Sequence, residues 1–86
     1  MNYKKEYLET FLAHQGQLFD EPVAETIQEA DEFLDECMAV VVNSIKEVKN
    51  YFEENGMDTS GMTAEELKGE AEVFEMPDGK YLIVEG

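Results

Sequence analysis

The chain has 86 residues, with 21 acidic and 6 basic side chains and a net charge of -15, which suits one small acidic domain over residues 1–86. Every base is a lysine, so the chain lacks the arginine fork that binds phosphate, and its charge disfavours direct binding to nucleic acid or anionic membranes. The same charge favours a cationic partner, and the 43% of apolar residues is enough to form a folded core.

The cysteine content and the N-terminal sequence bear on the cellular compartment. Cys37 is the only cysteine, so no intramolecular disulfide can form. The first ten residues, MNYKKEYLET, lack the apolar stretch of a signal peptide. The longest unbroken apolar run extends from Met38 to Val42, far short of a membrane span. We therefore expect a cytoplasmic protein without membrane contact.

The first predicted element is a short amphipathic helix over roughly Tyr3 to Gln15, with Gly16 as its stop. Its apolar side chains recur at helical spacing on one side: Tyr7, Leu8, Phe11 and Leu12. Residues 17–25 then predict an irregular connector. We expect Leu18 and Phe19 in this connector to pack back onto the core.

The longest apolar pattern predicts one central helix. Thr26 followed by Glu29 fits a capping box, the pattern runs to Phe52, and Asn55-Gly56 is a typical C-terminal stop. Such a helix would span about 40 Å, with a kink or break allowed at the three valines of 40–42 because β-branched residues lose rotamer freedom in a helix. The apolar arc covers roughly 200° instead of the usual ~100°, so the helix must be covered on two sides.

The C-terminal third predicts a short helix and a hairpin. Thr63 and Glu66 fit a second capping box, opening a helix of about two turns that ends near Gly69. Strands at 73–76 and 80–84 flank the turn sequence Pro77-Asp78-Gly79. The predicted fold is therefore α+β: a long central amphipathic helix packed with a short N-terminal helix, a two-turn helix and a C-terminal two-stranded antiparallel β-hairpin.

Residues for catalysis are scarce. His14 has no identifiable partner, and Cys37 lies within the apolar stripe of the central helix, where a buried thiol acts as a small hydrophobe. Neither Ser44 nor Ser60 stands in a nucleophile elbow, and the glycines do not cluster as a phosphate-binding loop would require. We predict no catalytic residue, no cofactor and no enzyme activity.

Metal binding is weakly indicated although carboxylates abound. Asp31 and Asp35 stand one helical turn apart, but no histidine follows a glutamate at the spacing of zinc or di-iron helices. Residues 58–61 resemble a calcium loop only loosely, because Gly56 occupies the position where the first ligand should stand. We predict no metal site.

The segment from Asp20 to Glu36 carries eight acids and no base. Acids near the start of a helix complement its dipole, so solvation and capping explain part of this asymmetry. The alternative is nucleic-acid mimicry, because carboxylates one turn apart lie about 5–6 Å from each other, close to the spacing of phosphates along a strand. The residues of this candidate face are Glu29, Glu32, Asp35 and Glu36.

The final strand does not alternate between apolar and polar residues. Its side chains are apolar on both faces of the pleat: Tyr81, Leu82, Ile83 and Val84. One explanation is that helices or the connector cover both faces. The other is that the strand pairs its free edge with a second copy, giving a homodimer, or with a partner protein.

These features favour a non-catalytic protein-interaction or regulatory module that binds a macromolecular partner through the acidic face, the hairpin edge, or both. The first alternative is a nucleic-acid mimic that inhibits a basic DNA- or RNA-binding protein. The second alternative is a small enzyme or accessory subunit using carboxylates, which would need a cleft.

Overall fold

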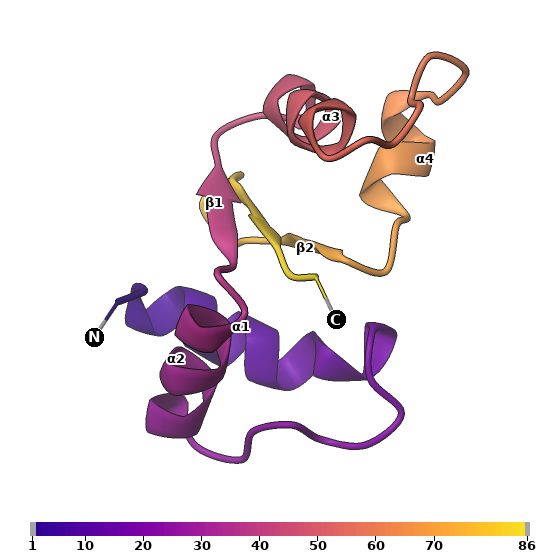
Figure 1. Ribbon diagram of the computed structural model, residues 1–86. Coiled ribbons are helices and arrows are strands. Elements are labelled where there is room, and N and C mark those ends of the chain that lie inside the picture. The colour runs from indigo at the N-terminus through magenta and orange to yellow at the C-terminus, as the bar shows by residue number, and fades with distance from the viewer. Residues whose placement is uncertain (1, 86) are drawn as a thin grey trace.

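The computed structural model describes residues 2–85 and has the predicted α+β class (Figure 1). Four α-helices, one 3₁₀ helix and three strands follow in the order α1 (Lys5–His14), η1 (Gln15–Gln17), α2 (Ile27–Glu36), β1 (Val40–Val42), α3 (Ile45–Glu54), α4 (Ala64–Lys68), β2 (Val73–Glu75) and β3 (Tyr81–Ile83). Within the described residues, no helix combines the length and the apolar content needed to cross a bilayer.

The sheet has three antiparallel strands in the order β1-β3-β2, so β3 is the central strand. Leu82 stands opposite Val41 on one side and Phe74 on the other. The prediction of a two-stranded hairpin was therefore incomplete. The hairpin forms as expected around Gly79, whose φ of 86° suits glycine, but a third strand joins it from the middle of the chain.

The predicted long central helix is wrong. The helix that Thr26 caps, α2, ends at Glu36, and β1 and a separate helix, α3, occupy the rest of the predicted span. Met38 has a φ of 56° and turns the chain, with its amide donating to the Asp35 carbonyl at 3.1 Å. The Ala39 amide donates to the Leu34 carbonyl at 3.0 Å, which completes the six-residue closure of a Schellman motif.

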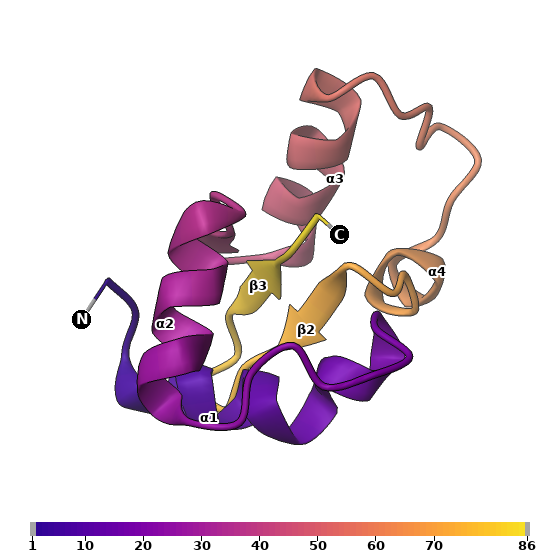
Figure 2. The same cartoon turned by 60° about the horizontal axis from the view of Figure 1, so that its bottom comes forward.

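The break divides the wide apolar arc between the two faces of the sheet. Helices α1 and α2 cover one face and α3 and α4 cover the other, as Figures 1 and 2 show. One core cluster unites the first pair of helices with Phe74 and Leu82, and the second unites the other pair with Val73 and Ile83. Both faces of β3 are apolar because each meets a helical layer. This agrees with the first of the two explanations drawn from the sequence, that helices cover both faces of the final strand.

Side-chain caps fix where the helices begin. Both predicted capping boxes are present, at Thr26 and at Thr63. Ser44 opens α3 by accepting a hydrogen bond from the Glu47 amide at 3.3 Å, a third cap that the long-helix prediction obscured. The first helix ends at His14, one residue before its predicted end, and Gly16 lies within the 3₁₀ turn η1 that follows.

The connector after η1 is held by one buried amide side chain. Gln15 is 9% exposed, and its Nε2 donates to the Ala24 carbonyl at 2.9 Å. Its Oε1 accepts from the Val23 amide at 2.8 Å. As predicted, Leu18 and Phe19 are half-buried and pack against the first core cluster. The connector therefore closes one end of that cluster.

Candidate functional site

The acidic residues predicted to form one face do not act alike. All four candidates, Glu29, Glu32, Asp35 and Glu36, are exposed on α2. The Glu29 carboxylate, however, accepts from the Glu25 amide at 2.9 Å and the Thr26 amide at 3.2 Å, which caps the helix. Glu32 accepts from Gln28 at 3.3 Å. The exposed face is thus real, but one of its carboxylates is committed to the fold.

Asp31 lies away from that face. It is 7% exposed, and its Oδ1 accepts hydrogen bonds from the Asn2 amide at 2.9 Å and the Tyr3 amide at 3.0 Å. The Tyr3 hydroxyl then donates to the carbonyls of Leu34 at 3.1 Å and Ala39 at 2.7 Å, just where α2 ends. Asp31 therefore anchors the N-terminal segment to α2.

The residues of the final strand do not present a free edge. Leu82, Ile83 and Val84 are buried, Tyr81 is half-buried, and β3 pairs with a strand on each side. The edge-pairing hypothesis therefore cannot apply to β3. The open edges of the sheet belong to β1 and β2.

The open edge of β1 has few backbone groups available for pairing with another strand. Pairing of Val40 with Ile83 and Val42 with Tyr81 leaves Val41 opposite Leu82 at the centre of this three-residue strand. The ends of the strand are already engaged, because the Ala39 carbonyl accepts from Tyr3 and the Asn43 amide donates to Glu47 Oε1 at 2.9 Å. Such short, capped edges are how proteins prevent unwanted pairing.

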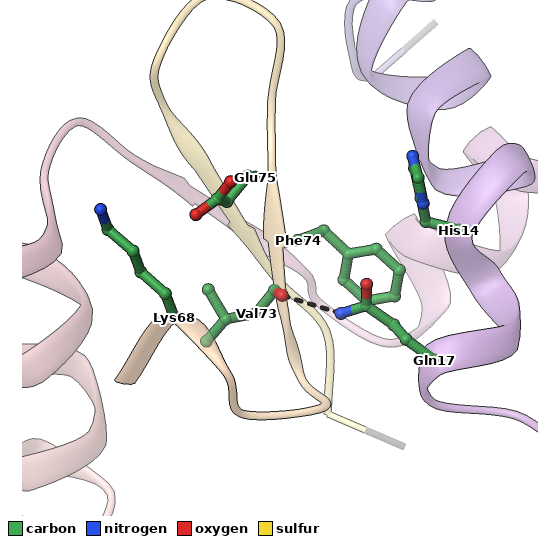
Figure 3. A pocket seen from close by; sticks show the side chains of 6 residues that line it. All are labelled: His14, Gln17, Lys68, Val73, Phe74 and Glu75. Atoms are coloured by element: carbon green, nitrogen blue, oxygen red, sulfur yellow. Dashed lines mark hydrogen bonds between the residues drawn. The ribbon is translucent and has the colours of Figure 1, made fainter. Parts of the chain in front are cut away.

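The open edge of β2 borders a pocket of about 360 Å³ (Figure 3). Four structural elements supply its six lining residues: His14 from α1, Gln17 from η1, Lys68 from α4, and Val73, Phe74 and Glu75 from β2. The Gln17 Nε2 donates to the carbonyls of Val73 at 2.8 Å and Ala71 at 3.0 Å. The edge is therefore closed by a side chain at one end and open at Glu75.

The titratable side chains of this β2 pocket do not converge. In Figure 3, Lys68 and Glu75 lie on one side of β2 and His14 lies on the other. In the part of the chain that the structure describes, no hydrogen bond joins any two of these three side chains. A general base needs its proton donor within about 3 Å, so this arrangement supports binding better than acid–base chemistry.

Cys37 is the only thiol of the chain, and the carboxylates are its most numerous potential metal ligands. The Cys37 thiol is half-buried at the C-terminal end of α2, so the prediction of a buried thiol within a helix was wrong. Burial and, to a lesser degree, the neighbouring Glu36 charge raise its pKa, which disfavours the thiolate. Among residues 2–85, no group of three or more His, Cys, Asp or Glu side chains could hold a metal ion.

The pocket residues were not found from sequence, apart from His14. Gln17 and Val73 are 56 positions apart, and no local pattern predicts their contact. Comparison with known proteins adds no further assignment, because the chain matches no protein-family model, no curated protein and no solved structure.

Proposed function

We propose that this chain is a non-catalytic cytoplasmic module that binds an extended, basic segment of a partner protein along the open edge of β2. The observation that carries the proposal is the backbone of Glu75, which lies beside the β2 pocket and has no hydrogen-bond partner among residues 2–85. Strand addition to such an edge is a common mode of peptide recognition, in which main-chain hydrogen bonds provide affinity and adjacent pockets provide specificity.

The register of the hairpin supports this reading of Glu75. The Met76 amide donates to the Lys80 carbonyl at 2.8 Å and the Val84 amide donates to the Glu72 carbonyl at 2.9 Å. In an antiparallel ladder the bonded positions alternate, so the backbone groups of Val73 and Glu75 point away from β3. The Val73 amide donates to the Glu70 carbonyl at 3.0 Å and its carbonyl accepts from Gln17, which leaves Glu75 available.

The charge of the chain supports a basic partner over a second copy. Two molecules of net charge -15 repel each other, whereas a lysine- or arginine-rich segment is attracted at long range. The free thiol of Cys37 suits a reducing compartment, in keeping with a cytoplasmic module. We therefore expect binding to weaken as salt is added.

A proline at the open edge tests the proposal. Peptides selected from a library for binding to the unaltered chain should bind Glu75→Pro at least tenfold more weakly, because the variant lacks the outward amide while proline is tolerated at a sheet edge. Glu75→Gln is the matched control, since it changes the side chain and keeps the amide. Equal binding to the proline variant and the unaltered chain would exclude the β2 edge.

A second candidate, nucleic-acid mimicry, is supported by the exposure of Glu29, Glu32, Asp35 and Glu36 on α2. Changing all four to Gln or Asn should abolish binding to a basic nucleic-acid-binding protein, with a steep salt dependence in the unaltered chain. A control with four other exposed acids changed, Glu6, Glu9, Glu53 and Glu54, has the same net charge. If both variants lose binding equally, general charge and not this face is responsible.

A further inference from the structure

A second pocket, of about 430 Å³, lies at the end of the sheet where Glu72 precedes β2 and Glu85 follows β3. Six residues line this end-of-sheet pocket: Leu18, Phe52, Asn55, Met57, Glu72 and Glu85. It opens between the two helical layers, because Leu18 packs on the first core cluster and Phe52 belongs to the second. Its volume falls within the roughly 300–1,000 Å³ of typical ligand sites.

The lining of the end-of-sheet pocket combines an apolar floor with acceptors. Leu18, Phe52 and Met57 supply apolar surface. Met57 is 36% exposed, which is unusual for a large apolar side chain of this protein. Glu72 and Glu85 supply two carboxylates, and no lysine is among the lining residues. An apolar surface next to uncompensated carboxylates is complementary to a cation carried on a hydrocarbon stem.

Hydrogen bonds hold the walls of this pocket in place. Glu85 accepts from the Tyr51 hydroxyl at 3.1 Å, and the Met57 amide donates to the Phe52 carbonyl at 2.9 Å. The Asn55 side chain donates to the Tyr51 carbonyl at 2.8 Å, which leaves its amide oxygen as an acceptor. A site whose walls are fixed in advance needs less ordering when a ligand binds.

We propose that the end-of-sheet pocket receives an arginine side chain from a partner protein. The methylene stem would lie on Phe52 and Met57, and the guanidinium would donate to the carboxylates of the pocket. Arginine fits better than lysine because its planar group carries five donors and can serve several acceptors at once. The chain has no arginine of its own, so it cannot fill this pocket from within.

The inference shares with the proposed function the assumption of a basic partner, but it concerns a different surface. The probe is therefore N-acetyl-arginine amide, which has no need of the β2 edge, titrated into the ¹⁵N-labelled chain and followed by NMR. We expect amide shifts centred on Phe52, Asn55 and Met57. N-acetyl-citrulline amide, which has the same shape without the charge, should bind at least tenfold more weakly.

Variants of the pocket separate specific binding from general attraction. Glu72→Gln with Glu85→Gln should weaken binding of the arginine probe at least tenfold. The matched control, Glu9→Gln with Glu65→Gln, removes the same charge from exposed positions outside the pocket and should change binding less than twofold. Met57→Lys places a cation in the pocket and should also prevent binding of the arginine probe. The amide spectrum of this variant reports whether the fold is intact.

Two results would overturn the inference: equal weakening by the pocket variant and its control, or shifts spread over the acidic surface of α2. A different variant tests the proposed function at the β2 edge, so the two proposals can fail independently. Glu75→Pro should leave binding of the arginine probe unchanged while it abolishes binding of a selected extended peptide.

Discussion

The Tyr7 hydroxyl donates a hydrogen bond of 2.5 Å to the Asp78 carboxylate, joining α1 to the turn between β2 and β3. Asp78 is also held locally, because its other oxygen accepts from the Lys80 amide at 3.2 Å. The hydrogen bond to Asp78, then burial, raise the pKa of Tyr7 to about 12. The same hydrogen bond is the main cause of the lowered pKa of Asp78. The contact ties residues 71 positions apart and closes one end of the first core cluster.

This contact predicts a stability loss at high pH. The folded-state pKa of Tyr7 exceeds the unfolded value of about 10, so its contribution is complete below pH ~10 and is lost as the pH rises towards 12. For Asp78 the sign is opposite: its lowered pKa gives stability above about pH 4 that is lost on further acidification. Urea denaturation across both pH ranges measures these effects.

Tyr7→Phe should remove the alkaline dependence, because no hydroxyl is left to ionise, and should reduce the acidic dependence, because Asp78 then keeps only its hydrogen bond from the Lys80 amide. Asp58→Asn is the control. The pKa of Asp58 is also lowered, chiefly by the Ser60 amide, but within the described residues its carboxylate accepts hydrogen bonds from Ser60 and from no tyrosine. An unchanged alkaline profile in Tyr7→Phe would show that the contact does not contribute to stability.

The central position of β3 predicts that Leu82 is among the most sensitive residues. Leu82 is 0% exposed and is paired on both sides, so Leu82→Ala should lower the free energy of unfolding by about 2–5 kcal/mol through lost burial and the cavity left behind. Val41, its partner on the open edge, is 36% exposed, so Val41→Ala should cost less than about 1 kcal/mol. Similar losses of unfolding free energy in Leu82→Ala and Val41→Ala, measured by chemical denaturation, would contradict the strand order.

One carboxylate of the acidic segment, that of Asp31, is expected to stabilise the fold locally. Asp31→Ala should lower the free energy of unfolding by about 1–3 kcal/mol, because the amides of Asn2 and Tyr3 lose their acceptor. Hydrogen exchange of these two amides should accelerate. Asp35→Ala, an exposed position on the same helix, should change stability by no more than about 0.5 kcal/mol. If Asp31→Ala and Asp35→Ala changed the free energy of unfolding equally, Asp31 would behave as an exposed residue and not as an anchor of the N-terminal segment.

Local signals in the sequence predicted the ends of elements better than their arrangement. The capping boxes at Thr26 and Thr63 and the turn at Gly79 were predictable because each depends on residues within a few positions of one another. The third strand was not, because 40–42 is apolar at a spacing that a helix or a buried strand fits equally well. Its pairing with β3 spans about forty positions and has no local signature.

The sites were less predictable than the fold for the same reason. The acidic residues of α2 were visible because they are close in sequence, whereas the β2 pocket combines α1, η1, α4 and β2. The end-of-sheet pocket likewise unites Leu18, Phe52 and Glu85. The apolar final strand did signal that something covers both faces, and the structure shows that this short chain provides both layers itself.

Met38 explains why the break allowed at 40–42 was not placed at the end of α2, and it yields the last prediction. A residue with positive φ at the C-terminal end of a helix is usually glycine, but here it is a methionine that is 79% exposed. The left-handed conformation costs a non-glycine residue roughly 1–2 kcal/mol, while glycine has more entropy to lose on folding. Met38→Gly should therefore raise the free energy of unfolding by up to about 1 kcal/mol in urea denaturation. Met57→Gly is the control, since Met57 is also exposed but lacks a positive φ, and it should give no gain. A loss of stability in Met38→Gly would mean that the methionine side chain contributes more through its contacts than its backbone conformation costs.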